Sequence, residues 1–246
     1  MAELRRLFVP PDAFRGDELE LDGERLRHAR TVLRLRPGDE FAVTDGAGAE
    51  FRVAIERLGR TAGSARVLGR SSPQRESPLR TVLAQAVPRG DRFAFVLEKA
   101  VELGVSVVAP VLSGRTVPSG AGGGQAGPRW RRILEGALAQ SGRTRLPELR
   151  EPVSWPQLVT DDNLPALRLL LWEKAQTGLQ AVLQRQDAPA AALVAVGPEG
   201  GWSADEAQLA LQAGFIAVRL GPRTLRTDTA GLAALAVLQY RWGDLG

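Results

Sequence analysis

The segment that decides the fold reads Val196-Gly197-Pro198-Glu199-Gly200-Gly201-Trp202-Ser203. It follows an apolar stretch, Ala191 to Val196, that predicts a buried strand, and it precedes a helical pattern from Ala204 to Ala213. Ser203 and Glu206 have the spacing of a capping box, which defines the helix start. The glycines permit a tight turn that comes close to a ligand. We therefore expect a rigid rim at the carboxyl end of a strand, where open α/β sheets bind ligands; a plain turn is the weaker interpretation.

A second loop repeats this design near the end of the chain. The predicted strand Ile216 to Leu220 continues into Gly221-Pro222-Arg223-Thr224-Leu225-Arg226-Thr227-Asp228-Thr229 and then into a last helix, about Asp228 to Trp242. Thr227 or Asp228 is predicted to cap this helix, which leaves Arg223 and Arg226 near the ligand rim. A third strand end, Leu171-Trp172-Glu173-Lys174, has a similar position. Three strand ends are thus expected to line one pocket.

Around these loops, strands and helices alternate from about Pro78 to the end of the chain. The strands are apolar on both faces, which predicts a mostly parallel sheet covered by helices. Gly104 and Gly214 stand where helices are expected to end. The predicted strands are Arg80 to Ala86, Val105 to Val111, Leu167 to Trp172, Ala191 to Val196 and Ile216 to Leu220; the predicted helices are Arg92 to Leu103, Arg129 to Gln140, Leu179 to Gln186, Ala204 to Ala213 and the last helix.

Before this region, short strands predict a small barrel with one helix. A hairpin is expected to join Phe41 to Thr44 with Glu50 to Ile55. Asp22 is predicted to cap the helix, with Leu26, Ala29, Val32 and Leu33 as its buried stripe. Pro- and Ser-rich sequence from Ser71 places the boundary between a domain of residues 1–72 and one of residues 73–246. The predicted strands are Arg6 to Val9, Glu40 to Asp45, Glu50 to Leu58 and Ser64 to Leu68.

Composition limits the chemistry. The 246 residues fit two domains, and the absence of cysteine together with a single histidine, His28, makes a metal centre implausible. No apolar run approaches the roughly 18 residues that span a bilayer, so we expect a cytoplasmic protein. Lys99 and Lys174 are the only lysines, and the arginine-rich basic side suits an acidic polymer such as RNA. A GC-rich genome would produce the same bias, and composition alone leaves both explanations open.

The two glycine-bearing loops together resemble the paired signature of the SPOUT superfamily of knotted methyltransferases. More narrowly, the chain is similar to the RsmE family, which methylates N3 of a uridine in 16S ribosomal RNA of the small subunit. Four further stretches support the resemblance: Arg5-Arg6-Leu7-Phe8-Val9, His28 through Val32-Leu33-Arg34 to Gly38-Asp39, Glu98-Lys99-Ala100-Val101-Glu102-Leu103-Gly104, and Gln140-Ser141-Gly142-Arg143.

The resemblance implies a PUA-like β-barrel for RNA binding, followed by a SPOUT-type knotted α/β domain that acts as a homodimer in ribosome biogenesis. It implies S-adenosylmethionine as cofactor and no metal. Carried onto matching positions, the cofactor contacts are Leu171, Trp172, Glu173, Val196, Gly197, Pro198, Glu199, Gly200, Gly201, Leu220, Gly221, Leu225, Arg226 and Thr229.

Two departures from the family pattern stand out. Asp228 occupies a position where the family often has the longer Glu. The Gly-rich stretch from Ser119 to Pro128 replaces a segment that is usually more charged. Its Gly122, Gly124 and Gly127 satisfy a dinucleotide-binding spacing, but Pro110 and Pro118 are expected to disrupt a preceding strand, so a flexible loop is the better interpretation.

Methyl transfer to N3 of uridine requires loss of the N3 proton and stabilisation of the resulting anion. Arg226 is our first choice for the anion, because a guanidinium donates two parallel hydrogen bonds, and Arg223 is second. Asp228 is a candidate proton acceptor, although a helix cap is an equally good role for it.

RNA contacts are predicted for arginine clusters and are expected to weaken as salt rises. Arg27, Arg30 and Arg34 lie three and four apart and would form one helical stripe, although a solvated face is an equally good interpretation. His28 fits a structural or RNA-facing role. The full set is Arg5, Arg6, Arg27, His28, Arg30, Arg34 and Arg143, with Arg129, Arg131, Arg132 and Arg145 as further candidates.

Three other functions remain open at this stage. One is a SPOUT enzyme that modifies transfer RNA or a ribose 2'-hydroxyl, which analysis of the modified nucleoside would separate. Another is a noncatalytic ribosomal RNA-binding factor, against which the intact glycines of both loops argue. A dehydrogenase is a distant third, since no credible dinucleotide fingerprint is present.

Overall fold

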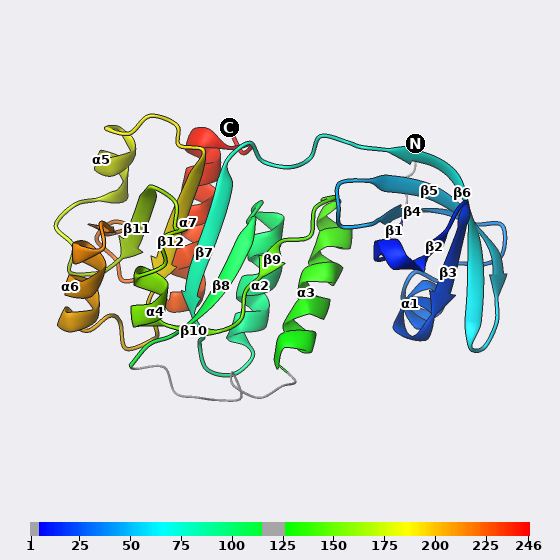
Figure 1. Cartoon of the computed structure of the whole chain (residues 1–246), viewed down its shortest axis with the longest axis horizontal. Helices are drawn as coiled ribbons and strands as arrows, with labels where there is room; N and C mark the ends of the chain where they lie inside the picture. The colour runs from blue at the N-terminus through cyan, green and yellow to red at the C-terminus, as the bar shows by residue number, and fades with distance from the viewer. Residues whose placement is uncertain (1–4, 115–125) are drawn as a thin grey trace. The chain divides into compact units, whose positions relative to one another are not determined.

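The computed structural model describes residues 5–114 and 126–246. The chain forms two compact units: the first groups the chain up to Glu76 with Glu135–Leu146, and the second groups Ser77–Leu134 with Pro147–Gly246. Among the described residues, no helix has the length and apolar character needed to cross a membrane. Each unit has its own sheet (Figure 1).

The second unit is built on a parallel sheet, as predicted. Its strand order is β10-β8-β7-β12-β11-β13, and β9 also pairs with β8. The strands are β7 (Arg80–Ala86), β8 (Val107–Leu112), β9 (Glu148–Leu149), β10 (Val153–Ser154), β11 (Leu167–Leu171), β12 (Ala191–Val196) and β13 (Ile216–Val218). The helices are α2 (Arg92–Glu102), α4 (Trp155–Val159), α5 (Leu179–Leu183), α6 (Ala204–Gln212) and α7 (Thr227–Trp242). Helix α3 (Ala126–Ser141) begins in this unit, and its residues from Glu135 on are grouped with the first unit.

Helices cover both faces of this sheet (Figure 1). On one face, Trp155 of α4 and Ala207 of α6 belong to a buried cluster with apolar side chains of the central strands. On the other face α7 packs against β7 and β12, and α2 packs against α7. Gly231 of α7 allows this close approach, because a Cβ there would lie 3.0 Å from side-chain atoms of Leu83 and Val196. The strands are therefore buried on both sides, as their apolar sequences predict.

Local signals set several boundaries of this unit. Ser203 and Glu206 form the predicted capping box at the start of α6. Gly104 and Gly214 have φ angles of +76° and +80°, the left-handed conformation that ends a helix. Pro110, expected to disrupt a strand, lies inside β8 and is paired with Gln85; loss of one N–H leaves the other ladder bonds of β8 in place. Pro118, Gly122 and Gly124 lie outside the described residues.

The first unit is a curled, six-stranded sheet around its own apolar core. Its order is β1-β4-β5-β6-β3-β2; β1 is parallel to β4, and the other pairs are antiparallel. The predicted hairpin is present, with Thr44 opposite Glu50. Irregular pairing at two points of β5 helps the sheet to curl. The strands are β1 (Arg6–Phe8), β2 (Phe14–Arg15), β3 (Glu18–Asp22), β4 (Glu40–Thr44), β5 (Glu50–Leu58) and β6 (Ala62–Ser71), with a short 3-10 helix at Pro11–Ala13.

The helix of this unit differs from the prediction. It consists of α1 (Gly23–Arg27) followed by a π-helical segment, His28–Val32. Asp22 precedes it but binds Arg25 at 2.6 Å instead of capping the backbone. The wider π turn shifts the side chains around the axis, so Leu26 and Ala29 are buried while Val32 is 63% exposed. Val32 therefore departs from the buried stripe that we predicted, whereas Leu33 is partly buried against the core.

Residues 135–146 join the first unit through backbone bonds of Gly46 and Gly48 and through the side chain of Glu76. Its carboxylate accepts hydrogen bonds from the Arg143 guanidinium at 2.7 and 3.1 Å and from the backbone N–H groups of Thr144 and Arg145. The predicted boundary after residue 72 did not anticipate this segment, since its contacts join residues that are distant in the sequence. Burial raises the pKa of Glu76, but these donors and the Arg143 charge outweigh it and hold the pKa below its ordinary value of 4.5.

Glu76→Gln is expected to lower the free energy of unfolding by about 2 kcal/mol at pH 7, because it weakens charge-assisted bonds and removes the negative charge beside Arg143, which is 8% exposed. The lowered pKa means that this stabilisation is present above pH 4.5 and is lost as the pH falls through the folded-state pKa. Denaturant unfolding at pH 7 and pH 3 measures both effects. Glu56→Gln, which affects the exposed pair with Arg66, is the matched control with a change below about 0.5 kcal/mol.

Candidate active site

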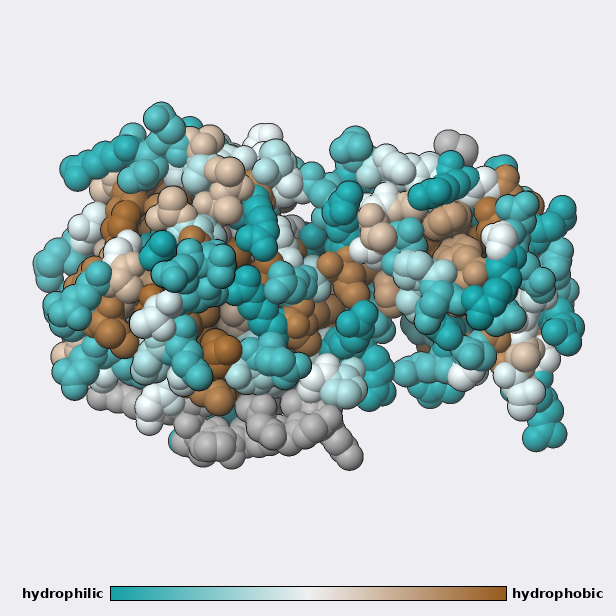
Figure 2. All heavy atoms as spheres, in the orientation of Figure 1, coloured by the Kyte–Doolittle hydropathy of each residue, from teal (hydrophilic) through white to brown (hydrophobic). Residues whose placement is uncertain are grey.

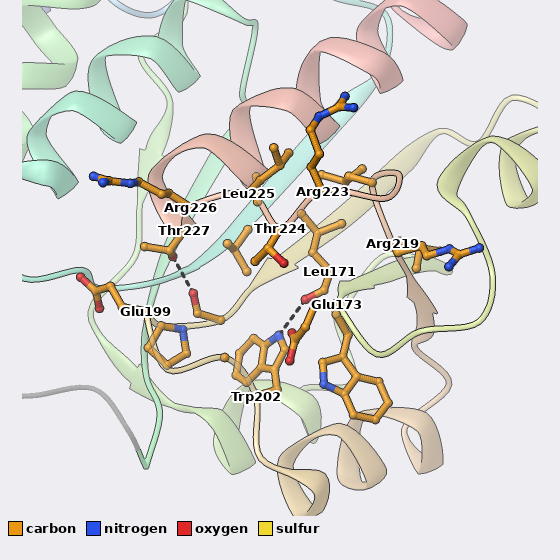
Figure 3. A pocket seen from close by; sticks show the side chains of 18 of the residues that line it. Leu171, Glu173, Glu199, Trp202, Arg219, Arg223, Thr224, Leu225, Arg226 and Thr227 are labelled. Carbon is orange, nitrogen blue, oxygen red and sulfur yellow. Dashed lines mark hydrogen bonds between the residues drawn. The ribbon is translucent and has the colours of Figure 1, made fainter.

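A cavity of about 610 Å³ opens at the carboxyl edge of the parallel sheet of the second unit. The loops that follow β11, β12 and β13 line it, so the three strand ends meet in one pocket (Figure 3). Lining residues anticipated as cofactor contacts are Leu171, Trp172, Glu173, Val196, Gly197, Pro198, Glu199, Gly200, Gly201, Leu220, Gly221, Leu225 and Arg226. Thr229, also anticipated, is an exposed residue of α7 outside this lining.

The loop after β12 is held in a tight turn. Gly201 has a φ of +65°, and its N–H donates to the carbonyl of Pro198 at 2.9 Å. Beneath the loop, the ring of Trp202 packs so closely on Gly197 that a Cβ there would lie 3.2 Å from the indole. Trp202 Nε1 also donates to the carbonyl of Leu171 at 3.2 Å, which ties this loop to the end of β11 (Figure 3).

The loop after β13 ends in a helix start that we predicted incorrectly. Helix α7 begins at Thr227, so the cap position belongs to Arg226, which makes no side-chain capping bond. The Thr227 hydroxyl instead donates to the carbonyl of Gly197 at 2.5 Å (Figure 3). This bond explains why the Thr227 hydroxyl does not cap the helix, and Asp228 is the second residue of α7, past the cap position. The two loops are thus in direct contact.

Three charged side chains meet on one side of the cavity. Glu199 accepts a hydrogen bond from the backbone N–H of Arg89 at 3.0 Å and lies 3.9 Å from the Arg92 guanidinium. Arg92 also lies 4.0 Å from Asp228, whose side chain is 17% exposed. Asp228 itself is not among the residues that line the cavity.

Arginine side chains surround the cavity with positive charge. Arg226, Arg223 and Arg219 all line it, and Figure 3 shows Arg226 extending on the side of Glu199 while Arg223 and Arg219 extend elsewhere. Within the described residues, none of the three guanidinium groups has a hydrogen bond or an ion pair. They are free to bind an anionic ligand.

Several residues of the cavity were missed by sequence reasoning. Arg92 begins the predicted helix that follows the predicted strand Arg80 to Ala86. This position could have identified Arg92 as a cavity residue, because the loops at the carboxyl edge of one sheet converge. Trp202 and Thr227 stood inside the quoted loops, but nothing in the sequence identified their partners. The residues missed are Arg92, Trp202, Val218, Arg219, Pro222, Thr224, Thr227 and Ala230.

The candidate RNA contacts all lie in the first unit. Arg34 is exposed at a φ of +53° and lies beyond the helical segment, which ends at Val32, so it does not form the expected helical stripe with Arg27 and Arg30. Burial lowers the pKa of His28; the Arg27 charge lowers it further, and the Glu24 charge raises it in part. The remaining candidates contact other residues of the protein: Arg5 contacts Leu33 and Asp39, Arg6 contacts Glu50, Arg27 contacts Glu24, Arg30 contacts the Gly59 carbonyl, and Arg143 contacts Glu76.

Of the further arginine candidates, Arg129 pairs with Asp91 at 2.6 Å. Arg145 lies beside Gly48, where a Cβ would come within 3.2 Å of its guanidinium. Most visible surface of both units carries hydrophilic side chains, with apolar ones in small patches (Figure 2). In the part of the chain that the structure describes, no three His, Asp or Glu side chains gather as metal ligands.

Comparison with known proteins decides the family. Residues 75–239 match the RNA methyltransferase domain, and residues 21–68 match the RNA methyltransferase PUA domain. Ribosomal RNA small subunit methyltransferase E of Synechocystis sp. is 37% identical over 94% of this chain and 76% of its own length. The chain belongs to the RsmE family of RNA methyltransferases. Its Mycobacterium bovis relative is 36% identical over 90% of this chain and 87% of its own length.

Two solved structures are similar to this chain over nearly its whole length. A putative methyltransferase from Legionella pneumophila, in complex with its cofactor SAM, is 34% identical with a TM-score of 0.92 and covers 99% of this chain and 100% of its own. Ribosomal RNA small subunit methyltransferase E from Neisseria gonorrhoeae, bound to S-adenosyl methionine, is 35% identical with a TM-score of 0.88 at the same coverage. The predicted SPOUT-type α/β fold preceded by a PUA-like domain is confirmed.

Proposed function

We propose that this RsmE-family enzyme transfers a methyl group from S-adenosylmethionine to N3 of a uridine in 16S ribosomal RNA. Its substrate in this proposal is the RNA assembled in the small ribosomal subunit. The observation that carries the proposal is the convergence of the loops at 197–201 and 221–227 on one cavity. The names of the relatives support ribosomal RNA as the substrate class. The choice of N3 of uridine as the methylated atom is based on the resemblance of the sequence to the RsmE family.

The cavity suits the proposed cofactor. Its volume of about 610 Å³ lies within the range of small-molecule sites. Apolar walls from Leu171, Val196 and Leu225 can pack against an adenine, and the Glu173 carboxylate, beside Gly201, can attract a sulfonium. When bound, S-adenosylmethionine supplies an electrophilic methyl group.

The chain's own residues then have two tasks. The loops hold the ligand and the base in line, which lowers the entropy cost of reaction. Arg226 stabilises the negative charge that spreads over N3 and its neighbouring carbonyls, with Arg223 as the second donor. Asp228 is our candidate for accepting the N3 proton, with Arg92 positioned 4.0 Å away.

RNA binding in this proposal uses the exposed arginines of the first unit, above all Arg34, together with the rim arginines of the cavity. Arg143 has a different role, because its guanidinium is buried against Glu76. Binding through phosphates should weaken as the salt concentration rises.

A homodimer is also part of the proposal. Helix α7 is apolar nearly all round, yet Val237 and Tyr240, three residues apart on one face, are 40% and 71% exposed. A second copy would cover this face, since a helix without a polar side is normally buried. Sedimentation of the purified protein measures this; a monomer at micromolar concentration would contradict it. We place the activity in the cytoplasm, where ribosomal subunits are assembled.

The decisive experiment is mass spectrometry of nucleosides from 16S ribosomal RNA of cells that lack this protein. We expect one N3-methyluridine to disappear and to return when purified enzyme and S-adenosylmethionine are added to small subunits. A 2'-O-methylated nucleoside, a modified transfer RNA or an unchanged nucleoside profile would each overturn the proposed reaction.

A further inference from the structure

Gln85 is a buried polar residue between the apolar residues Ala84 and Ala86 of β7. It lies in β7, is 0% exposed, and sits beside Val196, the last residue of β12, in the parallel pairing. It does not line the cavity. A buried amide lowers stability unless its polar atoms are hydrogen-bonded, so its partners indicate its purpose.

The partners of Gln85 connect the two loops of the cavity. Gln85 Nε2 donates to the Thr227 hydroxyl oxygen at 3.0 Å and to its own neighbour's carbonyl, that of Ala86, at 3.1 Å. The Thr227 hydroxyl then donates its single proton to the carbonyl of Gly197 at 2.5 Å. Because Gln85 occupies an acceptor lone pair of this hydroxyl, the hydroxyl proton is directed at Gly197. A chain of two hydrogen bonds thus runs from β7 through α7 to the loop after β12.

This chain of bonds holds Gly197 and Thr227, one residue at the edge of each cavity loop, in fixed positions. Gly197 is the first residue of the 197–201 loop, and Thr227 directly follows Arg226, whose carbonyl accepts the first helical bonds of α7 from Thr229 and Ala230. If the bond between Thr227 and Gly197 were lost, the start of α7 could shift, and Arg226 would move with it relative to the loop at 197–201.

Gln85 is not explained by stability alone. Its Oε1 has no hydrogen-bond partner among the described residues, although it is fully buried. An unsatisfied buried carbonyl is unfavourable, and an apolar side chain of similar size would avoid it.

We propose that Gln85 and Thr227 are positioning residues whose buried link holds the two cavity loops together and sets the affinity for the methyl donor. This inference rests on the proposed function for the identity of the ligand. It assigns no contact between Gln85 and the ligand.

Calorimetric titration of the full chain with S-adenosylmethionine tests the link. Thr227→Val, which removes only the hydroxyl function, is expected to raise the Kd about tenfold, and Thr227→Ser to restore it to within about twofold of wild type. Gln85→Met should raise the Kd about threefold to fivefold, because the hydroxyl stays but is no longer directed. The double variant should bind no more weakly than Thr227→Val alone, since both changes break one link.

Stability separates positioning from a general packing defect. Gln85→Met removes the unsatisfied oxygen, so its melting temperature should equal or exceed that of wild type while its affinity falls. Thr81→Val is the matched control: Thr81 is also fully buried in β7 with an unpartnered hydroxyl oxygen among the described residues, but it lies at the opposite end of the strand. Its Kd should not change. Unchanged affinity in Thr227→Val, or additive losses in the double variant, would overturn the inference.

Hydrogen exchange of the unliganded protein tests the link without any ligand. Amides of residues 197–201 should exchange faster in Gln85→Met and in Thr227→Val than in wild type or Thr81→Val. If wild type bound no S-adenosylmethionine, the proposed function would fail while this measurement still decided the link. Equal exchange rates in all four proteins would refute it.

Discussion

Arg226→Ala is expected to lower kcat about 100-fold to 1,000-fold, the size of effect seen when one donor to a developing anion is removed. Arg226 lines the cavity, and its guanidinium has no hydrogen bond or ion pair to other described residues, so it is available to the substrate. Its structural contribution is through its backbone carbonyl, which alanine retains. Single-turnover methylation of small subunits at saturating cofactor measures the loss.

Cofactor affinity distinguishes this role from a damaged pocket. The Kd for S-adenosylmethionine should stay within about threefold of wild type, because the lost interaction is with the base. Arg226→Lys should recover part of the rate, since it keeps the charge without the two-pronged geometry. Arg219→Ala, on another part of the rim, is the control with a smaller effect on kcat. An unchanged kcat in Arg226→Ala would transfer the role to Arg223 or exclude this mechanism.

Trp202→Ala is expected to destabilise the protein by about 4 kcal/mol and to weaken cofactor binding with it. The side chain is 2% exposed, stacks at 4.2 Å between ring centroids on Trp155, and supports Gly197 from below. Removing it leaves a cavity beneath the glycine loop and breaks the bond to the Leu171 carbonyl. Denaturant unfolding and calorimetric titration measure the two effects.

Trp202→Phe separates packing from hydrogen bonding. Phenylalanine keeps most of the ring contact with Trp155 and loses the N–H donor, so we expect about 1.5 kcal/mol of destabilisation and a partial loss of affinity. If Trp202→Ala were as stable as wild type, the indole would not be the support of the loop that its contacts indicate.

The sequence predicted those features of the fold whose causes are local. The capping box at Ser203, the helix ends at Gly104 and Gly214, and the apolar strands of the parallel sheet each depend on residues close in the chain, and the structure confirms them. Short elements such as β2, β9, β10 and α4 were missed, because two to five residues carry too little periodicity to be recognised.

Features that depend on a distant partner were not predictable in the same way. The role of Arg143 follows from Glu76, and the Thr227 hydroxyl serves Gly197 instead of the helix end. The π-helical segment at His28–Val32 likewise overrides the helical period that placed Val32 in the core. In the candidate site, glycine loops were recognisable as such, whereas their supports, Gln85 and Trp202, required the three-dimensional structure.

The strand order of the second unit also has a consequence for biosynthesis. Strand β7 is made early but pairs with β12, which the ribosome synthesises only after Ala191, and β11 then lies between β12 and the still later β13. Strand β7 has an early partner in β8 on one edge, but its other edge has no partner until β12 is made, and closing such a long loop is slow. The sheet of this unit can therefore be completed only late in synthesis or after it, and a chain that stops before Ala191 would lack the central pair of the sheet.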